Sequence, residues 1–248
     1  MSEIRPVAVA PTETRHLSPG DEVTPHRHDD HQLLYASSGV LEVMVPDGTW
    51  FTPSVRAVWV PGGTVHHWQV RGATTVHMVG IPAATPPPVE HVPSLVLVRP
   101  LFRELTIACS ANGPATTPAA RRLLRVLVDQ LEPSPGAATM LPTLRDTRLR
   151  NVQAILEADM TTSPGLAVLG RQVGASERTL SRLFHNEVGM GFPVWRNQLR
   201  LHLATRLLAE GKSVTRTAGA CGYSSASAFV TTFRQTFGQT PGSLYRPA

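Results

Sequence analysis

The stretch Leu169–Phe184, LGRQVGASERTLSRLF, decides the fold of the C-terminal third of the chain. Its pattern predicts a short helix that ends at Gly174, where glycine can supply a left-handed turn. Ser176 follows as a good N-cap for a second helix. Apolar residues of that second helix fall on one face, and a polar, basic face is formed by Arg178, Ser181 and Arg182. A helix, a tight glycine turn and a helix with a basic outer face indicate a helix-turn-helix.

The same spacing recurs in Ala218–Phe233, where Gly222 supplies the turn and Ser225 begins the second helix. Between the two copies lies Phe192–Glu210, roughly 19 residues that as a helix span about 29 Å. That length approaches the ~34 Å repeat of B-DNA. Two recognition helices held this far apart can enter successive major grooves on one face of a duplex.

Charge is distributed unevenly along the chain. Residues 1–160 carry 13 Lys and Arg against 15 Asp and Glu, a net charge of −2. Residues 161–248 carry 10 against 3, a net charge of +7. A basic C-terminal region favours a polyanionic partner. A solvated arginine-rich surface would give the same count, so charge alone leaves both interpretations open.

Length and composition indicate two compact domains. The chain has 248 residues, of which 42% are hydrophobic and 17% charged, which excludes a disordered chain. No run approaches the ~20 apolar residues of a membrane helix, and the N-terminus lacks a signal-peptide pattern. Cys109 and Cys221 form neither a disulfide framework nor a thiolate metal motif. We therefore expect a cytoplasmic protein.

Residues 20–81 have the pattern of several short strands. The apolar runs QLLYA, VLEVMV, RAVWV and TTVHMVGI are separated by turn signals at residues 37–39, 46–48, 61–63 and 71–72. This spacing predicts a β-sandwich or β-barrel. The proline-rich residues 82–93 predict an extended connector. Helical patterns follow at residues 94–110, 118–131 and 144–158, and Pro100 predicts a helix start or kink within the first of them.

The C-terminal residues match a known family in several places. The matching residues are Arg178–Phe184 with Gly189, Arg200 and Ala204–Leu208, Gly222–Phe229, and Phe233–Pro241. On these residues, 164–248 resembles the DNA-binding domain of the AraC/XylS family of bacterial transcription regulators. The resemblance implies base contacts by Arg178, Ser181 and Arg182 in the first recognition helix and by Ala226, Ser227, Val230 and Thr231 in the second. Arg196, Arg200 and Arg234 flank these helices and are expected to hold phosphates.

The second recognition helix departs from the family pattern. The family often has arginine where this chain has Thr231 and glutamine-like residues near Ala226. Methyl and hydroxyl groups can contact thymine methyls or phosphates, but they cannot make bidentate contacts to guanine. We therefore expect the first helix to contribute most of the direct base readout. Phosphate contact or helix capping is the alternative role for Ser227 and Thr231.

The N-terminal region concentrates histidines. His26, His28 and Gln32 share the parity that puts side chains on one face of a strand, whereas His31 has the opposite parity. With Gly20 and Gly39, these residues resemble the first motif of the cupin superfamily, except that Gln32 replaces the usual glutamate. The segment Pro61–His66 resembles the second motif. The resemblance covers roughly residues 16–82 and implies an antiparallel jelly-roll barrel.

Three imidazoles and an oxygen ligand suit a divalent transition metal with an open coordination position. The metal ligands implied by the cupin resemblance are His26, His28, Gln32 and His66. Glutamine is neutral and a poorer ligand than glutamate, so two alternatives stay open: an effector pocket without metal, and histidines with a structural role. His67 is expected outside the barrel, and the sequence does not fix where His77 points.

The sequence thus predicts an α+β protein of two domains. Residues 1–90 form a cupin-type (jelly-roll) sensor barrel, residues 91–160 a helical connector that is a candidate dimerisation element, and residues 161–248 an all-α double helix-turn-helix. We expect a sequence-specific activator or repressor that binds double-stranded DNA as a homodimer and responds to a small-molecule or metal effector. The alternative is a metal-dependent cupin enzyme with an appended DNA-binding domain. No motif places the catalytic acid or base that such an enzyme needs, so we expect no enzymatic activity.

Overall fold

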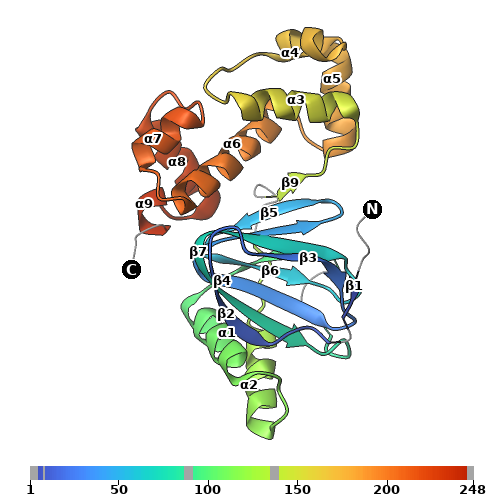
Figure 1. Ribbon diagram of the computed structural model, residues 1–248, viewed down its shortest axis with the longest axis vertical. Helices are drawn as coiled ribbons and strands as arrows, with labels where there is room; N and C mark the ends of the chain where they lie inside the picture. The colour runs from blue at the N-terminus through green and yellow to red at the C-terminus, as the bar shows by residue number, and fades with distance from the viewer. Residues whose placement is uncertain (1–4, 8, 87–91, 135–139, 245–248) are drawn as a thin grey trace. The chain divides into compact units, whose positions relative to one another are not determined.

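The computed structural model describes residues 5–7, 9–86, 92–134 and 140–244 and contains two compact units (Figure 1). The β-domain comprises Met1–Pro46 and Trp50–Ala137, and the helical domain comprises Asp47–Thr49 and Ala138–Ala248. This division differs from the predicted one, which placed a separate connector at residues 91–160. Within the described residues, no helix is long and apolar enough to cross a membrane.

The β-domain is built on a mostly antiparallel sheet, as predicted. Its strands are β1 (Arg5–Pro6), β2 (Glu13–Leu17), β3 (Glu22–Arg27), β4 (His31–Val45), β5 (Gly48–Thr52), β6 (Arg56–Val60), β7 (His66–Ile81) and β8 (Ser94–Leu97). They follow the order β1-β3-β7-β4-β5, while β2 also pairs with β7, and β6 pairs with β4 and β8. Only the short β1–β3 pairing among the registered pairs of this domain is parallel.

Two of the predicted turns are wrong. The glycines at positions 39 and 72 lie inside the continuous strands β4 and β7, where the register shifts between Ala36 and Val40. Gly39 has φ 72°, and a Cβ there would lie 2.2 Å from the Thr74 side chain. Bulges at these positions bend the long antiparallel pair of β4 and β7 without ending either strand, which is why a turn-like sequence forms no turn.

Helices α1 (Pro100–Asn112) and α2 (Pro118–Asp129) pack on one face of this sheet (Figure 1). The buried cluster includes Tyr35 and Trp59 of the sheet, Phe102 of α1 and Leu127 of α2. Of the helical pattern at residues 94–110, the part from Pro100 onward forms helix, so the helix start predicted at this proline is confirmed. Residues Ser94–Leu97 instead form β8, because the edge of β6 offers their backbone groups hydrogen-bond partners, and α1 begins at Pro100.

The helical domain contains both predicted helix-turn-helix units. Its elements are β9 (Met140–Pro142), α3 (Thr147–Ala158), α4 (Leu166–Val173), α5 (Glu177–Leu183), the π-helix η1 (Phe184–Val188), α6 (Phe192–Ala209), α7 (Val214–Ala220), α8 (Ala226–Phe237) and α9 (Pro241–Leu244). Helix α6 runs from the α4–α5 unit to the α7–α8 unit (Figure 1).

Each helix-turn-helix unit of the helical domain has its own hydrophobic core. The first contains Phe184 and Trp195, and α3 contributes Leu149, Val152 and Leu156 to it. Because α3 buries its apolar face there, it belongs to the helical domain and not to a separate connector. The second core contains Leu201, Ala204, Leu208, Phe229, Phe233 and Phe237. Phe184, Phe229, Phe233 and Phe237 are all buried in these two cores.

Candidate functional site

The two recognition helices, α5 and α8, begin in the same way. The Ser176 hydroxyl accepts the Thr179 N–H at 3.1 Å, and the Ser225 hydroxyl accepts the Ala228 N–H at the same distance. Counted from these caps, the residues of α5 and α8 correspond one to one. Arg178 corresponds to Ser227, Ser181 to Val230, and Arg182 to Thr231.

The outer face of α5 is basic. Arg178 and Arg182 are exposed and Ser181 is half-buried. With Thr179 and His185 they line an open surface hollow of about 430 Å³. His185 Nδ1 donates to the Ser181 carbonyl at 3.0 Å, which turns its Nε2 away from the helix backbone. The sequence prediction omitted His185, although the helical spacing of positions 178, 181, 182 and 185 is a signal for His185 on this face.

The outer face of α8 is uncharged over the matching positions. Ser227 and Thr231 are exposed, and Ala226 and Val230 are half-buried. The two helices therefore present different chemistry on the same scaffold, and at these matched positions only α5 offers guanidinium groups that can pair with guanine.

The three flanking arginines have different surroundings. Arg234 is exposed in the last turn of α8. Arg196 instead donates to the Pro164 carbonyl at 3.3 Å and lies over the Phe192 ring. Arg200 donates to the Ser163 hydroxyl at 2.6 Å. Arg196 and Arg200, both half-buried, thus join α6 to the segment before α4. Phosphate contact by all three arginines stays a prediction.

In the β-domain, the structure brings together the four residues of the expected metal site. His26, His28 and His66 are buried, and one ring nitrogen from each lies within 4.8 Å of the others. His26 is directly opposite His66 in the pairing of β3 with β7. Gln32 Oε1 lies 3.3 Å from His28 Nε2 and 3.1 Å from His66 Nε2.

Backbone carbonyls set the orientation of all three imidazoles. The Nδ1 atoms donate to carbonyl oxygens of Thr24 at 2.9 Å, Asp30 at 2.6 Å and Thr64 at 3.0 Å. A carbonyl only accepts, so each Nδ1 carries a proton, and in the neutral ring each Nε2 then holds the lone pair. Burial lowers the pKa of His26 and lowers that of His66 to about 3, which keeps both rings neutral.

The glutamine in this site lacks a good partner. Its Oε1 faces two nitrogens that also hold lone pairs, while its buried Nε2 has no hydrogen-bond partner. A cation at the centre would accept electron pairs from the oxygen and from the imidazoles. Three neutral imidazoles and an amide oxygen are a donor set that suits a divalent transition metal. An amide turned by half a rotation, with Nε2 donating to an imidazole, would also remove the conflict.

Other histidines of this domain lie elsewhere. His31 accepts the Gly62 N–H at 3.0 Å, and its ring lies 5.0 Å from that of Trp59 on the helix-covered face of the sheet. His77 bonds to Ser110 of α1 and to Ser37, each at 2.9 Å. Its place between the sheet and α1, which the sequence did not fix, is structural.

Comparisons with known proteins agree with this architecture. A family model described as an AraC-like ligand binding domain matches residues 13–134, and one described as a helix-turn-helix domain matches residues 169–246. The HTH-type transcriptional regulator NimR of Escherichia coli (strain K12) is 34% identical over 227 residues, which are 90% of this chain and 82% of NimR.

Two solved structures are also similar. An AraC-type DNA-binding domain from Chromobacterium violaceum is 31% identical and covers 40% of this chain and 88% of its own, with a TM-score of 0.37. ToxT from Vibrio cholerae is 12% identical and covers 95% of this chain and 97% of its own, with a TM-score of 0.40.

A double helix-turn-helix joined to a ligand-binding β-domain defines a DNA-binding transcriptional regulator. With the extent of its match to NimR, this chain belongs to the AraC/XylS family of such regulators.

Proposed function

We propose that this regulator senses its effector at a divalent transition metal held by His26, His28, His66 and Gln32. The observation that carries the proposal is the convergence of three Nε2 lone pairs, each set by a backbone carbonyl that holds the opposite nitrogen. The orphaned amide of Gln32 supports it, because a cation would resolve the contact between acceptors.

The donor set also indicates the class of effector. A divalent ion acts here as a Lewis acid with an open position. Four neutral donors would leave its charge uncompensated in a buried site, and a buried charge needs a counter-charge. An effector that completes this site would therefore carry an anionic oxygen, such as a carboxylate.

Metal analysis of the purified full-length protein tests the proposal. We expect about one equivalent of a transition metal, retained by His67→Ala and lost by His28→Ala. His67 is the matched control because it neighbours His66 but has the opposite parity on β7. Both variants should still bind DNA, because the helical domain is a separate unit. No stoichiometric metal, and no effect of a chelator on effector response, would indicate an effector pocket without metal.

We also propose that α5 supplies most of the base readout, through Arg178, Ser181 and Arg182. The exposure of the two guanidinium groups supports this assignment, and so does the absence of charge at the matching positions of α8. On this view Ala226, Ser227, Val230 and Thr231 make apolar and hydroxyl contacts, and Arg234 binds a phosphate.

A homodimer through α1 and α2 is the proposed form of the protein on DNA. Leu101 of α1 is 55% exposed and Val126 of α2 is 43% exposed, so apolar surface remains after these helices cover the sheet. Sedimentation of the full chain should show a dimer at micromolar concentration, weakened by Leu101→Glu. A monomer at that concentration would contradict the proposal. We place this non-enzymatic function in the cytoplasm, where a bacterial regulator meets DNA.

A further inference from the structure

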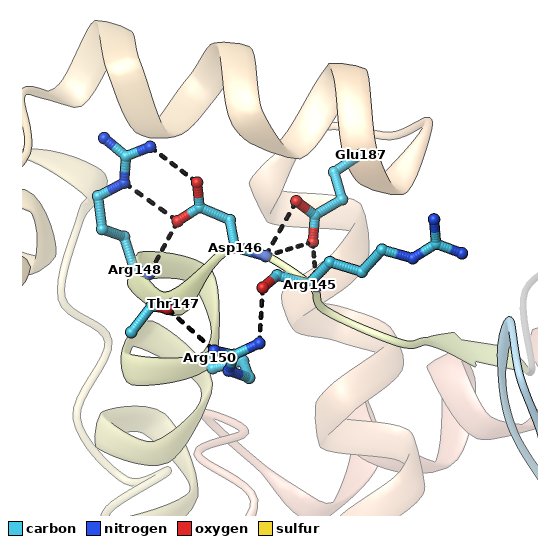
Figure 2. Close-up of polar contacts among 6 residues, drawn as sticks. All are labelled: Arg145, Asp146, Thr147, Arg148, Arg150 and Glu187. Carbon is cyan, nitrogen blue, oxygen red and sulfur yellow. Dashed lines mark hydrogen bonds and ion pairs between the residues drawn. The ribbon is translucent and has the colours of Figure 1, made fainter.

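A carboxylate at the end of the first recognition helix binds the start of another helix. Glu187 lies in η1, which continues directly from α5. Its Oε1 accepts the Arg145 N–H, and its two oxygens accept the Asp146 N–H at 3.0 and 3.1 Å (Figure 2). These two residues lead directly into α3. Backbone N–H groups at a helix start have no partner within the helix and favour an anion.

The nearby negative charge of Asp146 is paired with Arg148, which reduces its repulsion of the Glu187 carboxylate. Asp146 is the N-cap of α3, and its carboxylate is held by Arg148 through two bonds of 2.7 and 3.0 Å. That pairing with Arg148 lowers the pKa of Asp146 to about 2. Arg150 donates to the Arg145 carbonyl at 2.6 Å and fixes the same peptide from the other side (Figure 2).

The contact joins two elements of one core. Leu149 and Val152 of α3 pack with Leu180 and Phe184 in the first hydrophobic core. Apolar packing fixes how far apart such helices lie, but it is non-directional. The hydrogen bonds from Glu187 add direction, because they tie the end of α5 to one end of α3.

The second helix-turn-helix has no carboxylate at the matching position. Counted from the N-cap serines, Glu187 corresponds to Thr236. The Thr236 hydroxyl donates to the Thr232 carbonyl at 3.1 Å, within α8 itself. A carboxylate that reaches a preceding helix is thus a property of the first unit at this position.

We propose that Glu187 is a positioning residue for DNA readout: its carboxylate sets the angle at which α5 presents Arg178 and Arg182. The chain enters α3 from the β-domain through Arg145 and Asp146, the two residues whose amides Glu187 holds. The segment that precedes α3 is therefore hydrogen-bonded to η1, which continues α5, the recognition helix that carries Arg178 and Arg182.

Variants of the full-length protein test this proposal, with Thr236→Ala as the matched control. In Glu187→Ala, amide hydrogen exchange at Arg145 and Asp146 should accelerate at least tenfold. The ratio of specific to non-specific DNA affinity, measured at one salt concentration, should fall about fivefold or more. Glu187→Gln keeps an acceptor oxygen and should restore most of both values. Thr236→Ala should leave exchange at Arg145 and Asp146 unchanged.

A purely structural role would lower specific and non-specific binding together, in proportion to the folded fraction seen in thermal unfolding. A folded Glu187→Ala protein with an unchanged affinity ratio would overturn the proposal. So would equal losses of that ratio in Glu187→Ala and Thr236→Ala. If Glu187→Ala fails to fold, Glu187→Thr, which carries the residue of the second unit at this position, replaces it in the same two measurements with the same expected losses.

Discussion

The two helix-turn-helix units of this regulator share a scaffold but differ in what they offer to DNA. Each recognition helix begins at a serine cap and is followed at the same spacing by a buried phenylalanine and a glycine with positive φ, which for α5 lie in η1 and at its end. The outward positions differ: Arg178 and Arg182 in α5 correspond to Ser227 and Thr231 in α8.

This difference separates the residues that the fold requires from those that base readout requires. The shared residues are those that the fold needs, because caps, turns and core positions respond to local backbone geometry and burial. The divergent residues face outward and cost the fold little whichever side chain they carry. Repetition of the motif therefore predicts that both helices can enter a groove, but not that both read bases.

The largest expected effect is a loss of stability in one helix-turn-helix unit while the other keeps its stability. Phe184 and Phe233 are fully buried and belong to different cores. Each change to alanine should destabilise its own unit by about 3–5 kcal/mol. Hydrogen exchange should accelerate around α5 in Phe184→Ala and around α8 in Phe233→Ala. Equal acceleration in both units in either variant would mean that the two cores unfold as one.

The next effect concerns the outward faces. Arg182→Ala should weaken specific binding by about 1–3 kcal/mol, as expected for loss of a bidentate base contact. Thr231→Ala, at the matching position, should change it by less than about 0.5 kcal/mol. Fluorescence anisotropy with one labelled duplex at fixed salt measures both. A larger loss in Thr231→Ala would reverse the assignment of readout.

Arg234 is expected to bind a phosphate, in contrast to the base contact expected of Arg182. If it binds a phosphate, Arg234→Ala should lower affinity for every sequence alike and reduce the slope of log K against log salt by about 0.9. Arg182→Ala should instead reduce the difference in affinity between specific and non-specific DNA. A sequence-dependent loss in Arg234→Ala would show that it contacts a base.

The smallest expected effect is the same in both units. Ser176→Ala and Ser225→Ala each remove a side-chain cap with a bond of 3.1 Å, and each should cost about 1 kcal/mol of stability. Chemical denaturation of the two variants measures this directly. A cost confined to one variant would show that the scaffolds are less alike than their caps indicate.

The helical domain could be predicted from the sequence almost element by element. Its helices, caps and glycine turns depend on residues a few positions apart, such as Ser176 and Thr179. The β-domain was harder, because Gly39 forms a bulge through its approach to Thr74 on another strand. Residues Ser94–Leu97 likewise form a strand only because β6 lies beside them.

The candidate sites follow the same rule. Strand parity predicted that His26, His28 and Gln32 lie close together, but for the wrong reason: His26 lies in β3, His28 directly after it and Gln32 in β4. The short connection between β3 and β4 brings them together, and the turn before His66 indicated the fourth member. Glu187 carried no such signal. Its partners are backbone amides of Arg145 and Asp146, which any residue could supply, so only the fold shows the contact.

Binding-site selection from random DNA, run in parallel with wild type and Arg182→Ala, tests the central claim about readout most directly. We expect two half-sites in the wild-type selection, one with strong base preference that includes guanine and one with weak base preference. Arg182→Ala should lose the strong preference and leave the weak half-site unchanged. A strong half-site with an unchanged guanine preference in Arg182→Ala would contradict this assignment, since Arg182 would then read no base.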